Sequence, residues 1–197
     1  MGTRGAYGFR LEGKDKVTYN HFDSYPSGLG NDVAKFLKEI SSVEELKEIF
    51  SNIELVDMDS KPTEKQKAKA KELDLVDLTV SSQSEDDWYC LLRKAQSGLE
   101  LYKEGLSFMI DSHNFLGDSL FCEWAYIINL DTAQLEVYQG WNKDHNASGR
   151  YAALNKGKEY AGIALYTTIP LENLFGKDLD LKYIKEEIDA EEQYSRN

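Results

Sequence analysis

Hydrophobic and polar residues alternate in two runs near the start of the chain, residues 3–11 and 16–22. Alternation with a period of two is typical of strands, and the Gly13-Lys14-Asp15 segment between the runs has the composition of a turn. The pattern predicts a β-hairpin. A cluster of polar residues, glycine and proline follows the second run, so the hairpin ends in a loop with more polar groups than a turn requires.

The hydrophobic period changes to that of a helix after this loop. Apolar residues three and four apart predict helices over residues 32–40, 42–53, 63–73 and 84–98. Polar residues that cap helix N-termini open the last three: Ser42, Thr63 and Ser84. The helix over 63–73 has little to bury and is expected to be solvated, whereas the helix over 84–98 carries a continuous apolar face.

Alternation returns in the second half of the chain and predicts strands over residues 106–110, 121–130, 134–141 and 160–169. The polar stretch 142–158 is expected to be a mobile surface loop, and the chain is expected to end in a helix with an acidic tail, residues 178–197. Strands at both ends with helices between them predict a single α+β domain over residues 1–197. Its sheet is expected to be mostly antiparallel and to pair the N-terminal hairpin with the C-terminal strands. The pattern leaves open whether the sheet packs in layers.

Composition narrows the choice of partners. The 197 residues include 35 acidic and 23 basic side chains, which gives a net charge of −12. This charge repels a phosphate backbone, so we expect no nucleic-acid partner. No apolar run reaches about 18 residues and the N-terminus lacks a signal-peptide pattern, so we expect a cytoplasmic protein with no membrane partner. Cys90 and Cys122 lie within apolar patterns and are expected to be reduced, buried thiols.

Motifs for metals and cofactors are not found in the sequence. The three histidines are scattered, and neither a metal-binding histidine spacing nor a glycine-rich phosphate loop occurs. The sequence therefore gives no support for a metal site, leaves metal dependence open and identifies no cofactor.

The loop after the hairpin holds the main candidate site. His21 and Asp23 are residue types that act as general bases, and Arg4 on the first strand can serve as an anion or oxyanion clamp. The loop leads into a helix, whose first N–H groups favour an anion, so the amides of residues 28–31 are candidate donors. The ligand-binding candidates are Asn20, Ser24, Tyr25, Gly28, Asn31 and the later Glu123. The alternative is a structured turn, in which Asp23 or Ser24 acts as a cap and the Tyr-Pro pair stiffens the chain.

Glu123 lies in a predicted strand whose other residues are nearly all apolar, so both faces of this strand are expected to be covered. A buried carboxylate needs a cation, several hydrogen-bond donors or a proton. Arg4, which interrupts the first strand, is the natural partner, and we expect a partly buried Arg4–Glu123 ion pair. The alternative is that Glu123 faces solvent on a sheet covered on one side only.

Three blocks of the sequence resemble a group of bacterial, phage and fungal proteins of unassigned activity. The blocks are MGTRG at the start, YNHFDSYPSGLG at 19–30, and CEWAYIINLD with LEVY within 122–138. The resemblance covers most of the chain and implies no particular reaction.

The first hairpin also resembles that of N-terminal nucleophile hydrolases of the choloylglycine hydrolase kind. In that family the first strand starts at the nucleophile, and the second ends in an Asn-x-Asp type element. Here Thr3 opens the first strand, and Asn20 with Asp23 closes the second. The family exposes a cysteine as its first residue, whereas no cysteine lies in this strand, so the resemblance implies the hairpin architecture without the nucleophile. We expect that Thr3 is not an N-terminal nucleophile, because no signal for cleavage before it is visible.

Two classes of function remain open. The leading prediction is a small-molecule-binding protein or a hydrolase-type enzyme, with its site at the first hairpin and the following loop. The alternative is an acidic interaction or inhibitor protein, such as one of phage origin, that binds a basic protein partner through its negative charge and the acidic residues 186–192. A concave pocket lined by the first hairpin favours the first class, and a convex acidic stripe favours the second.

Overall fold

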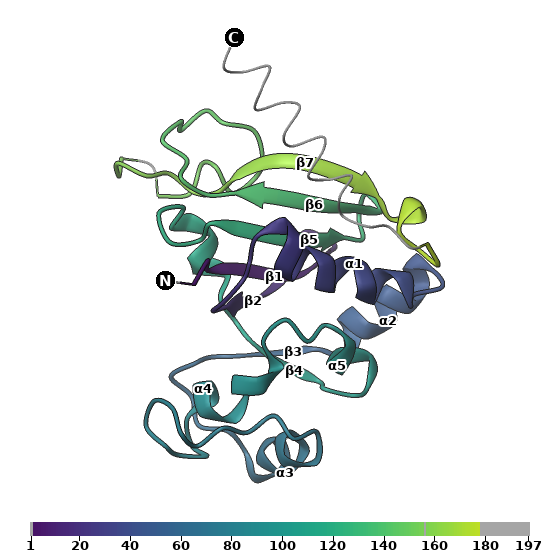
Figure 1. Ribbon diagram of the computed structural model, residues 1–197, viewed down its shortest axis with the longest axis vertical. Coiled ribbons are helices and arrows are strands. Elements are labelled where there is room, and N and C mark those ends of the chain that lie inside the picture. The colour runs from purple at the N-terminus through teal and green to yellow at the C-terminus, as the bar shows by residue number, and fades with distance from the viewer. Residues whose placement is uncertain (1, 156, 178–197) are drawn as a thin grey trace.

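A five-stranded mixed sheet forms the centre of the computed structural model, which describes residues 2–155 and 157–177 (Figure 1). The strand order is β2-β1-β5-β6-β7. The strands are β1 (Gly5–Leu11), β2 (Lys14–Asn20), β5 (Trp124–Asn129), β6 (Gln134–Gln139) and β7 (Ala164–Pro170). Each pair in this sheet is antiparallel except β1 with β5, which is parallel and joins the N-terminal hairpin to the later strands. The predicted α+β class and mostly antiparallel sheet are confirmed.

The β1–β2 turn lies one residue earlier than the sequence pattern suggests. Glu12 and Gly13 occupy its centre with φ angles of 51° and 73°. Two consecutive residues in the left-handed region are typical of the type I′ turn, whose twist matches that of the flanking strands. The carboxylate of Asp131, in the turn after β5, accepts hydrogen bonds from the N–H groups of Glu12 and Gly13 at 2.6 and 3.0 Å. The tip of the hairpin is therefore tied to the neighbouring turn.

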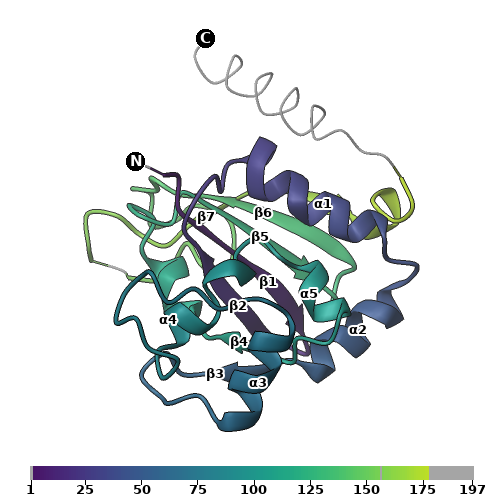
Figure 2. The same cartoon turned by 60° about the horizontal axis from the view of Figure 1, so that its bottom comes forward.

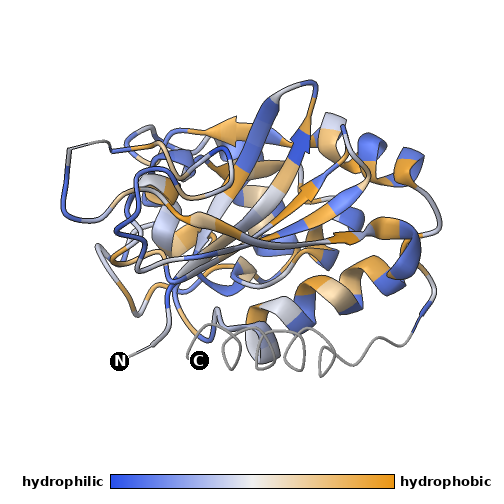
Figure 3. Cartoon of the chain, turned by 90° about the horizontal axis from the view of Figure 1, so that it is seen from above, coloured by the Kyte–Doolittle hydropathy of each residue, from blue (hydrophilic) through white to orange (hydrophobic). Residues whose placement is uncertain are grey.

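Both faces of the sheet are covered. One face carries Phe9 and Tyr126 and packs on two helices, α1 (Asn31–Lys38) and α2 (Val43–Asn52). The opposite face carries Ala125 and Ile127 and packs beneath the short helical turn η3 (His113–Gly117) and the segment between β6 and β7. Figure 3 shows by colour where hydrophobic residues lie along the helices and strands. Coverage on both sides explains why β5 is almost continuously apolar.

A smaller unit adjoins the outer edge of β2 (Figures 1 and 2). Its elements are β3 (Glu54–Val56), α3 (Glu64–Glu72), α4 (Trp88–Leu91), the turn η2 (Arg93–Ala95), α5 (Glu100–Lys103) and β4 (Phe108–Ile110). Strands β3 and β4 form a two-stranded parallel sheet. The N–H of Ser112, just after β4, donates to the carbonyl oxygen of Val17 on β2 and so attaches the unit to the main sheet.

The predicted helices differ in how well they match the structure. Ser42 caps α2 through the N–H of Glu45, and Thr63 opens α3 with a complete capping box, as the sequence predicts. The long helix predicted over 84–98 is wrong, because Asp87 caps a single turn that ends at Leu91. Its predicted apolar face is nevertheless buried, with Trp88 and Leu91 almost inaccessible to solvent.

The segment between β6 and β7 also departs from the prediction. Tyr151 and Ala152 are buried and cover part of the sheet, whereas most other described residues of the predicted surface loop are exposed or partly exposed. The predicted C-terminal helix and acidic tail, residues 178–197, lie outside the described residues. Within the described ranges, no helix has the length and apolar character needed to cross a bilayer.

Candidate functional site

The loop after β2 is a folded turn with its own hydrogen bonds. Asn20 and Ser24 are buried, and the side-chain amide of Asn20 donates to Ser24 Oγ at 2.9 Å. Ser97 Oγ donates to Asn20 Oδ1 at 3.0 Å, and the hydroxyl of Tyr126 donates to the Ser24 carbonyl at 3.1 Å. Asn20 and Ser24 therefore hold the loop in place, as in the structured-turn alternative, and this geometry gives their predicted ligand-binding role no support.

The amides predicted to bind an anion are already occupied. Residues Pro26–Gly30 form a wide helical turn before α1. Within it, Gly28 N–H donates to the Tyr25 carbonyl at 2.9 Å and Leu29 N–H donates to the Asp23 carbonyl at 2.8 Å. The N–H of Asn31 donates to the Gly28 carbonyl, and its side-chain amide donates to the Ser27 carbonyl. The prediction of free donors over 28–31 is wrong, because the turn extends the helix and uses them.

Gly28 is required by packing rather than by a ligand. A Cβ atom at this position would lie 2.0 Å from the carbonyl oxygen of Asp23. Asp23 and Tyr25 are exposed beside it, and the negative charge of Asp23 raises the pKa of the Tyr25 hydroxyl. Within the described residues, no hydrogen bond joins Asp23 to His21, so the predicted base and orienter are not paired.

His21 instead pairs with Tyr19. The Tyr19 hydroxyl lies 2.7 Å from His21 Nδ1, and the backbone N–H of His21 donates to Gln96 Oε1 at 2.9 Å. Residues two apart on a strand point to the same side, which explains this contact at the end of β2. The sequence reasoning missed Tyr19, although the period-two spacing was the available signal.

The protonation states of this pair follow from its surroundings. Burial, then the charges of Arg93 and Arg4, lower the pKa of His21, so the imidazole is neutral at pH 7. Burial raises the pKa of Tyr19, so its hydroxyl keeps its proton. Tyr19 can therefore donate to Nδ1, which leaves the His21 Nε2–H group as a donor toward a ligand.

The predicted ion pair between Arg4 and Glu123 is not formed. The backbone N–H of Arg4 donates to Glu123 Oε1 at 3.4 Å, and the N–H of Glu123 donates to the Arg4 carbonyl at 2.9 Å. The Arg4 guanidinium lies over the Phe121 ring instead, 5.5 Å from its centroid. Glu123 is half-buried and comes immediately before β5, and its carboxylate accepts a hydrogen bond from one backbone N–H group rather than from a guanidinium.

A second arginine, Arg93 of the smaller unit, stacks on the residue that follows His21. The Arg93 guanidinium lies 5.3 Å from the Phe22 ring centroid and 5.6 Å from that of Tyr89. Its Nε atom is buried without a hydrogen-bond partner. Arg93 and Arg4 both act electrostatically on Tyr19 and on His21. We call the group Arg4, Tyr19, His21 and Arg93 the arginine site.

The two arginines of this site differ from the others in the described part of the chain. Arg10 forms an ion pair with Asp15 at 2.8 Å, and Arg150 forms one with Glu136. Within residues 2–155 and 157–177, neither Arg4 nor Arg93 forms a salt bridge, although the charge of Arg93 contributes to lowering the pKa of Asp77. Both are positioned by aromatic rings, an arrangement that leaves guanidinium N–H groups available to an anion.

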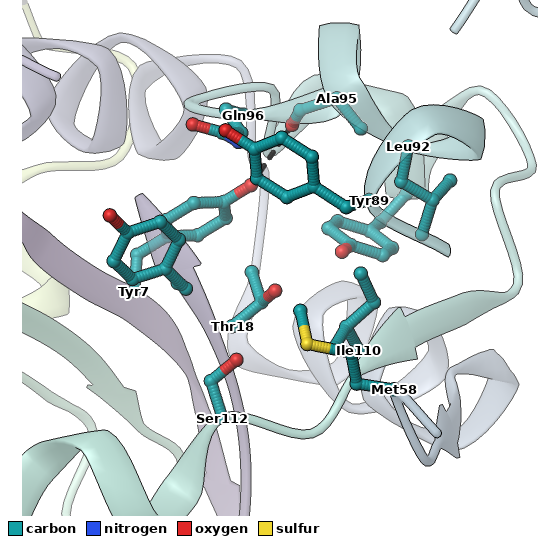
Figure 4. Close-up of a pocket in the computed structure, with 11 residues that line it drawn as sticks. Tyr7, Thr18, Met58, Tyr89, Leu92, Ala95, Gln96, Ile110 and Ser112 are labelled. Atoms are coloured by element: carbon teal, nitrogen blue, oxygen red, sulfur yellow. Dashed lines mark hydrogen bonds between the residues drawn. The ribbon is translucent and has the colours of Figure 1, made fainter. Parts of the chain in front are cut away.

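A small pocket adjoins the arginine site at the outer edge of β2 (Figure 4). Its volume is about 30 Å³, enough for roughly two water molecules. The apolar part of its wall comes from Met58, Leu92 and Ile110, and the polar part from Thr18, Tyr19, Tyr89, Gln96 and Ser112. The sequence could not reveal this pocket, because its walls come from segments far apart in the chain.

The remaining candidates offer little chemistry. Cys90 and Cys122 are buried free thiols, as predicted, and burial raises the pKa of Cys122 far above its ordinary value. The described residues contain no group of three or more His, Cys, Asp or Glu side chains placed to hold a metal ion. Comparison of the chain with protein-family models, curated proteins and solved structures gives no match. Function is therefore inferred from the site alone.

Proposed function

We propose that this chain binds a small anionic ligand at the arginine site. The observation that supports this most strongly is a pair of arginines, Arg4 and Arg93, that form no salt bridge in the described residues of a protein of net charge −12. Cations are expected to attract carboxylates in so acidic a chain. Arg4 and Arg93 instead stack on aromatic rings near His21, so their guanidinium groups are available to a ligand.

The chemistry of the site favours an anion with two negative charges. Arg4 and Arg93 supply two positive charges, and each guanidinium presents its N–H groups in a fork that suits phosphate or carboxylate oxygens. His21 is neutral at pH 7 and adds a hydrogen-bond donor without adding charge. A phosphate monoester, whose second pKa is about 6, matches this charge better than a single carboxylate does.

Binding is favoured over hydrolysis. A hydrolase of the predicted type needs a nucleophile or an oriented base beside His21. In the described residues, the hydrogen-bond partners of His21 are Tyr19 and Gln96. Burial raises the pKa of the Tyr19 hydroxyl and keeps it protonated, which makes it a weak nucleophile. The alternative of an acidic inhibitor depends in part on residues 186–192, which lie outside the described residues, and no observation on the site favours it.

Isothermal titration calorimetry with inorganic phosphate and phenyl phosphate tests the proposal. We expect saturable binding to the wild-type protein and a loss of about tenfold or more in affinity for Arg93→Gln, since a charge-assisted fork is removed. Lys94→Gln is the matched control, because Lys94 is the next residue, carries the same charge and pairs with Asp74 at 3.1 Å. Absence of saturable binding, or equal loss in both variants, would contradict the proposal.

A further inference from the structure

Two side chains connect the pocket with the arginine site. Tyr19 lines the pocket and bonds to His21, while Tyr89 lines the pocket and stacks on Arg93. Figure 4 shows Tyr89 among the residues that line the pocket. A single small molecule can therefore place its anionic group at the arginines and another part of itself in the pocket.

The polar groups of the pocket are neutral and available. Within the described residues, the hydroxyl groups of Thr18, Tyr89 and Ser112 have no hydrogen-bond partner. Gln96 uses its Oε1 atom to accept from His21 N–H, which leaves its NH₂ group to donate. Neutral hydroxyl and amide groups of this kind suit a ligand hydroxyl, because they can donate hydrogen bonds to it or accept one from it.

The size of the pocket limits what enters it. Space of about 30 Å³ accepts a fragment of two or three heavy atoms and excludes an aromatic ring or a long acyl chain. Met58, Leu92 and Ile110 line one side, so a short carbon unit bearing a hydroxyl fits better than a second charge.

From these three observations we infer that the ligand is the phosphate monoester of a small polyol. Its phosphate lies between Arg4 and Arg93, and its terminal hydroxymethyl group occupies the pocket beside Thr18 and Ser112. This inference rests on the proposed function and adds the chemical class of the ligand.

Calorimetry with glycerol 3-phosphate and propyl phosphate tests the inference, because the two esters share a phosphate and a three-carbon chain but differ in hydroxyl groups. The wild-type protein should bind glycerol 3-phosphate about tenfold more tightly, since its hydroxyl groups can form hydrogen bonds in the pocket that propyl phosphate cannot. Thr18→Val and Ser112→Ala should each reduce this preference and leave the affinity for propyl phosphate unchanged. Arg93→Gln should weaken the binding of both esters.

Thr168→Val is the matched control. Thr168 is an exposed residue of β7, and β7 is the opposite edge strand of the sheet from β2, so the same chemical change is made away from the pocket. Thermal unfolding of each variant verifies that it folds, and Ser112→Ala gives an independent test if Thr18→Val does not.

The possible failures are distinguishable. Equal affinity for the two esters, or equal weakening of both by Thr18→Val, would overturn the polyol assignment and leave the proposed anion site intact. Failure of inorganic phosphate, phenyl phosphate and both esters to bind would overturn the proposed function together with the inference. Glycerophosphocholine, a diester with a single phosphate charge, should bind more weakly than glycerol 3-phosphate; equal affinity would overturn the monoester assignment.

Discussion

Glu136 and Arg150 form a bidentate ion pair between β6 and the segment that follows it, with Arg150 Nη2 at 2.6 Å from Glu136 Oε1. Asn129 and Tyr138 donate further hydrogen bonds to the same carboxylate at 2.7 and 3.0 Å. The carboxylate is buried, so its charge is balanced inside the protein. This network fastens the cover over one face of the sheet.

Arg150→Met should destabilise the protein strongly. The substitution leaves the Glu136 carboxylate buried without its cation, and breaking such a pair costs about 3–5 kcal/mol. The free energy of unfolding in urea measures the loss. Lys143→Gln, which removes an exposed pair with Glu159, should change the free energy of unfolding little, because solvent screens this pair. A similar small effect for both variants would show that the buried pair is not needed for stability.

The same carboxylate should make stability sensitive to acid. Burial favours the protonated form, but hydrogen bonds from Arg150 and Asn129 outweigh it and hold the pKa of Glu136 below its ordinary value. The stabilisation is therefore complete above the unfolded-state pKa of about 4.3 and is lost as the pH falls through the lower folded-state pKa. Unfolding free energies of the wild type and Glu136→Gln, measured from about pH 7 to pH 3, should converge toward acid. Parallel curves would contradict this.

The pKa of His21 reports on the arginine site. Arg93→Gln removes one of the two positive charges that lower it, so the pKa should rise toward the ordinary value of about 6.5. Bound phosphate should raise it in the wild-type protein for the same electrostatic reason. Titration of the His21 imidazole by NMR measures both shifts. An unchanged pKa in Arg93→Gln would show that this guanidinium does not act on His21.

Asp131→Ala should loosen the tip of the first hairpin. The substitution removes two charge-assisted hydrogen bonds to the N–H groups of Glu12 and Gly13, at an expected cost of about 1–2 kcal/mol. Amide hydrogen exchange at these two residues should become faster. Thr132→Ala, at the next exposed position, should leave both exchange rates unchanged. Unchanged exchange in Asp131→Ala would mean that the turn is stable without the hydrogen bonds to Asp131.

Local patterns predicted much of the fold. Continuous apolar character in β5 indicated a strand covered on both sides, and capping residues located the starts of α2 and α3. The three-residue strand β3 was missed, because so short a segment shows no period. The helix predicted over 84–98 failed because its apolar spacing is satisfied by a single helical turn followed by η2.

The candidate site was predicted in position but not in composition. The residues at the end of the first hairpin were found, because polar clusters after strands are visible in sequence. Arg93 and Ser112 were not, since no local pattern shows that the smaller unit docks against the edge of β2. The role expected for Asn20 and Ser24 also depended on tertiary contacts, for Ser97 and Tyr126 complete their hydrogen bonds.

The parallel pairing of β1 with β5 has a consequence for synthesis on the ribosome. Arg4 and Glu123, which flank this pair, are 119 residues apart in the chain. The inner edge of the N-terminal hairpin must therefore stay unpaired while more than half of the protein is translated, and exposed strand edges favour aggregation. We expect the hairpin to depend on chaperones during this interval, and closure of the sheet to be a late, slow step of folding.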